Sequence, residues 1–146
     1  MSSKFLSVEK NRDMPEFPSN DLILSSSFDF GIRIWRAGET SSLHSIEFHE
    51  DFVTGASWCT LHPGMFASSD SGGNLAIWNL MEDIDYPIYT IKTDSIFTIE
   101  WQKDSSNILV GTLNGQIEIY PLKKANLKYN EEQFEEFQES VLNNFA

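Results

Sequence analysis

Short apolar runs separated by turn-forming residues fill the chain from residue 21 to about residue 122. The runs are rich in β-branched and aromatic residues, and clusters of Gly, Ser, Asp and Asn stand between them. This alternation is typical of many short antiparallel strands joined by tight turns. The sequence therefore predicts an all-β region over residues 21–122.

The two flanking segments follow different patterns. Residues 1–20 are polar and contain Pro15 and Pro18, so we expect a linker or a ragged lead-in there. The tail, residues 123–146, carries apolar side chains at helical spacing. They are Phe134, Phe137, Val141, Leu142 and Phe145. Asn130 can cap the helix start and Gln133 can return the bond, so an amphipathic helix is predicted over about residues 130–144.

The apolar runs recur at a fixed period. Three similar segments end in Trp35, Trp78 and Tyr120, which are 43 and 42 residues apart. A second series keeps step, because Trp58 and Trp101 are also 43 residues apart. A period of roughly 40–45 residues is typical of a four-stranded propeller blade of the WD-repeat kind.

The repeat resembles that of WD-repeat proteins, in which His, Ser or Thr, Asp and Trp side chains form a hydrogen-bonded network. By this resemblance the network candidates are Ser27, Asp29 and Trp35 in the first unit, His49 and Trp78 in the second, and Thr112, Asn114 and Tyr120 in the third. Gly72 stands at the Asp position of the second unit, and Lys92 stands where the third unit would have its His. We therefore expect an eroded network and blades that depend more on stacking.

The predicted fold is a partial WD-repeat β-propeller of about two and a half blades, followed by the helix. Closed propellers use roughly 4–8 blades. An apolar blade face and an unpaired strand edge are then left open, so another polypeptide can complete the propeller or the chain can associate with itself.

Several segments further resemble the dynein intermediate chains, of the cytoplasmic rather than the axonemal type. The strongest runs from His62-Pro63-Gly64 to Trp78-Asn79-Leu80, and the resemblance extends over residues 21–145. It implies a non-catalytic motor subunit that binds the dynein heavy chain and other dynein subunits in the cytoplasm, on the microtubule cytoskeleton. The alternative is a general WD-repeat interaction scaffold in another complex.

Charge narrows the classes of partner. The chain has 22 acidic against 10 basic residues and a net charge of −12, which repels phosphate backbones and anionic lipid heads. No apolar stretch approaches the length of a membrane span. Nucleic acid binding and membrane insertion are therefore not expected. The single cysteine, Cys59, rules out an intrachain disulfide and suits a cytoplasmic location.

The sequence offers little catalytic chemistry. Cys59 and His62 could form a thiol and base pair, but no carboxylate nearby in the motif would orient the base. The histidines, His44, His49 and His62, follow no metal-ligand spacing. A glycine-rich phosphate loop is also absent from the sequence. We therefore expect no enzyme activity, no cofactor and no metal.

The remaining candidates are protein-binding residues. Phe28, Phe30, Asp51 and Phe52 lie in turns that should emerge on one rim of the propeller, where aromatic side chains beside charges make good contact points. The alternative is that Phe28 and Phe52 pack between blades. Phe134 and Phe137 on the helix must be covered either by the propeller rim or by a partner.

Overall fold

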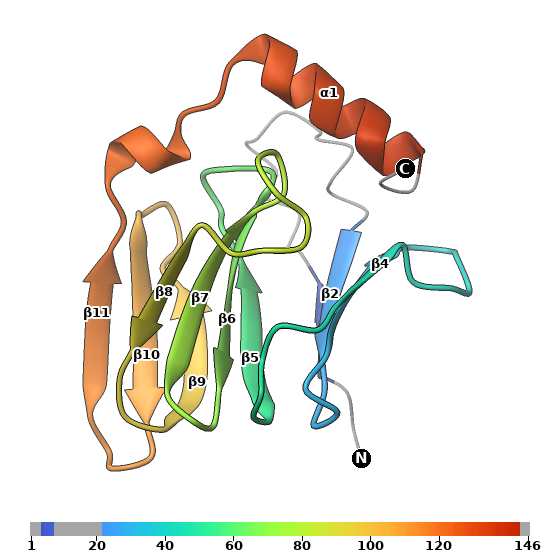
Figure 1. Cartoon of the computed structure of the whole chain (residues 1–146). Coiled ribbons are helices and arrows are strands. Elements are labelled where there is room, and N and C mark those ends of the chain that lie inside the picture. Colours follow the sequence, from blue (N-terminus) through green and yellow to red (C-terminus); the bar gives the residue numbers. More distant parts are fainter. Residues whose placement is uncertain (1–3, 8–21, 144–146) are drawn as a thin grey trace.

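Three antiparallel sheets stand side by side in the computed structural model, which describes residues 4–7 and 22–143. The first sheet contains β1 (Lys4–Ser7), β2 (Leu22–Ser26), β3 (Ile32–Arg36) and β4 (His44–Ile46). The middle sheet contains β5 (Val53–Trp58), β6 (Met65–Asp70), β7 (Asn74–Asn79) and β8 (Tyr89–Lys92). The third sheet contains β9 (Ile96–Trp101), β10 (Asn107–Thr112) and β11 (Ile117–Pro121). A 3-10 helix (Lys124–Leu127) and α1 (Glu131–Leu142) follow, and α1 crosses one end of the sheets (Figure 1).

Each sheet is a meander with strands in sequence order, as in successive propeller blades. The register also repeats, since Leu24 pairs with Ile34, Ala67 with Ile77, and Leu109 with Ile119. This architecture confirms the predicted partial propeller of WD-repeat blades.

Two apolar clusters hold the sheets together. Between the first and middle sheets, Leu24, Ile32 and Ile34 pack with Phe66 and Trp78, and all five are fully buried. Between the middle and third sheets lies the second cluster. It includes Met65, Ala67, Leu75, Ile77, Ile99, Trp101, Ile108 and Val110. Blade contacts are therefore made face to face, and the middle sheet is buried on both sides.

The turn before the third strand of each sheet needs a left-handed residue. Gly73 and Gly115 fill this position with φ of 92° and 85°. A Cβ atom on Gly73 would lie 2.1 Å from the carbonyl oxygen of Thr93, so no other residue fits there. In the first sheet the same repeat position is occupied by Phe30, with φ of 70°.

One expectation about the start of the chain is wrong. Residues 1–20 are not a linker throughout, because Lys4–Ser7 forms β1, which pairs antiparallel with β2. A strand of four residues is too short for its alternation to stand out from a polar segment. The first sheet thereby has the same four-stranded plan as the middle one.

The tail forms the predicted helix, with slightly narrower bounds. Asn130 accepts a bond from the Gln133 backbone and Gln133 returns one, so the predicted capping box is present. Phe137 and Val141 are only 3% and 0% exposed, because they pack into the cluster between the first and middle sheets. Arg36 donates a hydrogen bond to the Val141 carbonyl at 2.9 Å and ties the helix to β3.

The burial of Phe137 corrects its assignment as a partner-binding residue: of the two alternatives left open by the sequence, the sheets of this chain cover this side chain. The Leu142 side chain and Phe145, which belong to the same predicted face, lie outside the described residues. Neither helix in the described part of the chain is long and apolar enough to span a membrane.

Candidate functional site

A complete four-residue network lies inside the middle sheet. The two ring nitrogens of His49 contact Asp70 Oδ2 and Ser68 Oγ, each at 2.7 Å. Trp78 Nε1 donates to the same Ser68 oxygen at 2.8 Å. All four residues are buried, so the network joins the loop before β5 to β6 and β7 with its side-chain groups paired.

Burial and hydrogen bonding set the charge states in this network. Burial lowers the pKa of His49 and outweighs the opposing effect of Asp70, so the imidazole is neutral at pH 7. Burial alone would raise the pKa of Asp70. Bonds from the backbone and side chain of Asn74 and from His49 outweigh that effect and lower it, so the carboxylate stays ionised.

The network corrects the expectation that this unit had lost its aspartate. Gly72 does stand at the aligned position, but Asp70, two residues earlier at the end of β6, supplies the carboxylate. Gly72 leaves room instead, because a Cβ there would come 2.1 Å from Asp51 Oδ2. Sequence reasoning missed both Ser68 and Asp70. The available signal was the ten-residue spacing from Ser68 to Trp78.

The same ten-residue spacing identifies the serine of the first unit. Trp35 Nε1 donates to Ser25 Oγ at 2.8 Å, so Ser25 and not Ser27 partners this tryptophan. Ser27 instead accepts a bond from the Asp29 backbone. The Asp29 carboxylate pairs with Arg33 at 2.7 Å, and this bond lowers its pKa. The predicted trio therefore does not form one network.

The third unit is eroded, as expected. Thr112 donates to Asn114, which donates in turn to Asp94 at 3.1 Å. Tyr120 lies apart from that pair and donates its hydroxyl to Glu118. Val110 occupies the position equivalent to Ser68, so no hydroxyl is available to receive a bond from Tyr120.

Three phenylalanines form an exposed aromatic surface where the first and middle sheets meet. Phe28, Phe30 and Phe52 are 54%, 42% and 49% exposed. The Phe52 ring centroid lies 5.1 Å from that of Phe28 and 5.6 Å from that of Phe30. Asp29 and Asp51, both exposed, flank the rings in sequence. We call this set the Phe28 surface.

The structure thus brings four of the predicted binding residues to one place and separates the two on the helix. Phe28, Phe30, Asp51 and Phe52 come from the β2–β3 turn and the segment before β5. Phe134 is half-buried, with its ring centroid 5.8 Å from that of Tyr129.

Cys59 and His62 do not form a catalytic pair. The Cys59 sulfur accepts a backbone bond from Leu61, and burial raises the pKa of its thiol to about 11. Burial lowers the pKa of His62 to about 4. Its Nδ1 accepts a bond from the Gly64 backbone, and its ring packs edge-on against Tyr129. A protonated thiol beside an imidazole engaged elsewhere is a poor nucleophile.

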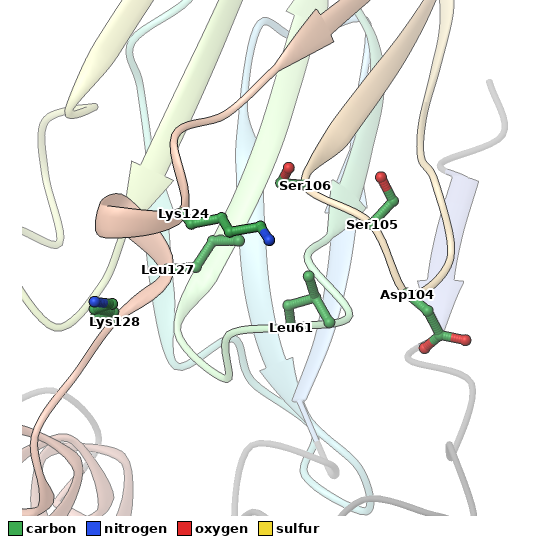
Figure 2. A pocket seen from close by; sticks show the side chains of 7 residues that line it. All are labelled: Leu61, Asp104, Ser105, Ser106, Lys124, Leu127 and Lys128. Carbon is green, nitrogen blue, oxygen red and sulfur yellow. The ribbon is translucent and has the colours of Figure 1, made fainter.

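A cleft of about 380 Å³ lies between the β9–β10 turn and the 3-10 helix, and Leu61 is one of its apolar lining residues (Figure 2). Its polar lining consists of Asp104, Ser105, Ser106, Lys124 and Lys128. Lys124 reaches across the opening, whereas Asp104 points away from it (Figure 2). These side chains do not form an acid and base pair at hydrogen-bonding distance. Among the described residues, no group of three or more His, Cys, Asp or Glu side chains could hold a metal ion.

Comparison with known proteins places these features in context. No family model matches the chain. The cytoplasmic dynein 1 intermediate chain of Drosophila melanogaster is 30% identical over 118 residues, which cover 79% of this chain and 18% of that protein. A crystal structure of the C-terminal WD40 domain of Sif2 superposes with a TM-score of 0.64 and 29% identity, over 76% of this chain and 31% of that one.

The chain spans less than a fifth of the length of the dynein relative that it matches. Together with the blade architecture, the two similarities support its resemblance to the C-terminal WD-repeat part of a dynein intermediate chain.

Proposed function

We propose that the chain is a non-catalytic WD-repeat subunit of a dynein-type complex, and that the Phe28 surface contacts the dynein heavy chain. The similarity to a dynein intermediate chain supports the choice of complex. On this proposal the protein acts in the cytoplasm at microtubules, with other dynein subunits as further partners. The main observation in favour of the Phe28 surface as a binding site is that three neighbouring aromatic rings are exposed.

Exposed aromatic rings are suited to a protein contact. Single exposed apolar side chains are common, but a contiguous aromatic group beside charges is a frequent interaction site. The rings of Phe28 and Phe52 contact each other at a tilted angle at the edge where the first and middle sheets meet, and about half of each side chain remains exposed to solvent. The neighbouring carboxylate of Asp51 favours a partner segment with basic as well as apolar side chains, whereas that of Asp29 is already paired with Arg33.

The conformation of Phe30 gives a second reason. Its positive φ lies at a position where the other two units use glycine, and a bulky residue there costs about 1–2 kcal/mol. The ring is exposed and recovers little of this through burial. Local strain of this kind concentrates at sites of function. A phenylalanine at this position is therefore better explained by binding than by stability.

Co-purification with the dynein heavy chain tests the proposal. The double variant Phe28→Ser and Phe52→Ser should reduce recovery of the heavy chain at least tenfold, because both anchoring rings are lost. Tyr86→Ser is the matched control, since Tyr86 is also exposed but lies in the loop between β7 and β8. If the double variant recovers as much heavy chain as the wild type, the Phe28 surface is not the contact with the heavy chain. Recovery of the wild type in another assembly without dynein would favour a general WD-repeat scaffold.

Phe30→Gly separates binding from stability. The substitution should raise the free energy of unfolding by about 1 kcal/mol, because glycine adopts positive φ without strain. It should also weaken heavy-chain recovery, because the ring is removed. A variant that is less stable than the wild type, measured by chemical denaturation, would contradict the strain at Phe30. If the variant is more stable but recovers as much heavy chain as the wild type, Phe30 does not contribute to binding.

A further inference from the structure

The cleft beside the 3-10 helix lies at the end of the third sheet that α1 crosses (Figure 1). Leu61 and Leu127 supply its apolar lining, and the side chains of Ser106, Lys124 and Lys128 supply polar groups. We call it the Lys124 cleft. The β2–β3 turn is at the opposite end of the sheets, so the cleft is separate from the Phe28 surface (Figure 1).

Hydrogen bonds hold the walls of the Lys124 cleft in place. The Ser106 carbonyl in the β9–β10 turn accepts a bond from the Leu122 backbone at 2.8 Å, which joins the turn to the end of β11. The Tyr89 hydroxyl donates to Asn126 of the 3-10 helix at 3.2 Å. A ligand would therefore enter a preformed site, and binding would cost little ordering entropy.

Positive charge gathers at this cleft, although the chain as a whole is acidic. The chain has ten Lys and Arg residues and a net charge of −12. Four of the ten lie in or beside the two segments that border the cleft, and all four are exposed. They are Lys103, Lys123, Lys124 and Lys128. Asp104, in the same turn as Lys103, points away from the opening (Figure 2).

The two lysines that line the cleft are available to a ligand. In the described part of the chain, neither Lys124 nor Lys128 has a carboxylate within ion-pair distance. Leu61 and Leu127 pack against the buried cluster between the middle and third sheets and also line the cleft. The site therefore combines an apolar lining with unpaired ammonium groups.

We propose that the Lys124 cleft binds a short acidic segment of a partner protein. One apolar side chain of that segment packs against Leu61 and Leu127, and its flanking carboxylates lie near Lys124 and Lys128. Opposite charges across a contact give specificity and faster association. The volume of about 380 Å³ is at the low end of the roughly 300–1,000 Å³ of ligand pockets, which suits a segment rather than a folded surface.

The position of the cleft distinguishes it from a contact between blades. The sheets of this chain contact one another through their faces, where the two apolar clusters lie. The Lys124 cleft instead lies at the strand ends, between the β9–β10 turn and the segment after β11. The inference also does not depend on the Phe28 surface.

Fluorescence anisotropy of a labelled peptide tests the cleft. The probe has the sequence Glu-Glu-Leu-Glu-Glu and should bind the purified protein saturably. Lys124→Glu should weaken this binding at least about tenfold, because a carboxylate would face an acidic peptide. Lys92→Glu is the matched control, since it changes the net charge equally but lies on β8, where Lys92 donates to the Gly72 carbonyl. This control should bind as the wild type does, and circular dichroism confirms that both variants are folded.

Changes in the peptide separate the apolar and the charged part of the contact. Serine in place of its leucine, or glutamine in place of its glutamates, should each weaken binding at least about fivefold. A peptide with lysine in place of each glutamate should bind the Lys124→Glu variant more tightly than the Lys92→Glu variant. Both variants have the same net charge, so this preference depends on the position of the new carboxylate.

The double variant Phe28→Ser and Phe52→Ser should bind the probe as the wild type does, so this inference and the proposed function can fail separately. Absence of saturable binding, equal weakening by Lys124→Glu and Lys92→Glu, or equal binding of the serine peptide would each overturn the proposal. Displacement of the probe by inorganic phosphate, at an ionic strength where chloride does not displace it, would also overturn it, because the cleft would then be a site for a phosphate group.

Discussion

The middle and third sheets are built from the same repeat but differ in what surrounds them. The middle sheet has neighbours on both faces, and every residue of β6 is buried. Among the described residues the third sheet has a neighbouring sheet on one face, and its β11 residues are half-buried or exposed. The strands and register agree, so neighbouring sheets rather than local sequence determine burial.

The side-chain hydrogen-bond network is also more complete in the middle sheet than in the third sheet. In the middle sheet His49, Ser68, Asp70 and Trp78 are joined, whereas the equivalent third-sheet positions hold Val110, Thr112 and Tyr120 without such a connection. The middle sheet therefore combines two buried faces with a buried polar network. We expect it to be the most stable part of the chain, and the following substitutions test that contrast.

Removal of the aromatic residue that ends the repeat should give the largest difference in stability loss between the middle and third sheets. Trp78 is fully buried and stacks on Phe66 with ring centroids 5.5 Å apart. Trp78→Ala should lower the free energy of unfolding by about 3–5 kcal/mol. Tyr120→Ala, at the equivalent half-buried position, should cost less than about 2 kcal/mol. Chemical denaturation compares the two variants, and equal losses would show that the sheets are equally packed.

Loss of the buried carboxylate should have the next largest effect. Asp70→Ala leaves the buried His49 and the half-buried Asn74 without their partner, so we expect a loss of about 3 kcal/mol in the free energy of unfolding. Thr112→Ala, at the equivalent position, removes a hydroxyl that contacts Asn114 and should cost about 1 kcal/mol. The contrast fails if the midpoint of urea unfolding shifts by the same amount in both.

Acid should weaken the middle sheet through its histidines. In the unfolded chain His62 takes up a proton below pH 6.5, whereas in the folded chain burial lowers its pKa to about 4. The unfolded state therefore binds more protons between these values, and stability falls as the pH falls. We expect a loss of about 2 kcal/mol between pH 7.5 and pH 5 from His62. The buried imidazole of His49 acts in the same direction.

His62→Asn provides the test of this assignment. The variant keeps a polar side chain beside Gly64 but cannot titrate, so its stability should depend less on pH than that of the wild type. Urea midpoints measured at both pH values give the comparison. If the stability of the variant depends on pH as strongly as that of the wild type, protonation of His62 is not the cause of the loss of stability in acid.

Much of the architecture could be predicted from the sequence because aromatic residues such as Trp35, Trp78 and Tyr120 recur at the blade period. The capping box at Asn130 and Gln133 was also predictable, since both partners lie within one helical turn. Strand β1 was missed because it is defined by its pairing with β2, which lies further along the chain.

The candidate sites were predicted less completely. The exposed turn residues Phe28, Phe30 and Phe52 were identified, but only the structure shows their rings together. Asp70 was missed because turn geometry, rather than an aligned position, brings its carboxylate to His49. Phe137 was misassigned because an apolar helix face does not reveal whether its cover comes from the same chain.

Paired truncation of Ile77 and Ile119 tests most directly whether burial in this chain is set by the neighbouring sheet. The two residues occupy the same repeat position, but in the described part of the chain Ile77 is 2% exposed and Ile119 is 59% exposed. Ile77→Ala should lower the free energy of unfolding by about 2–4 kcal/mol and Ile119→Ala by less than about 1 kcal/mol. Equal losses would contradict the assignment of β7 and β11 to a covered and an open blade.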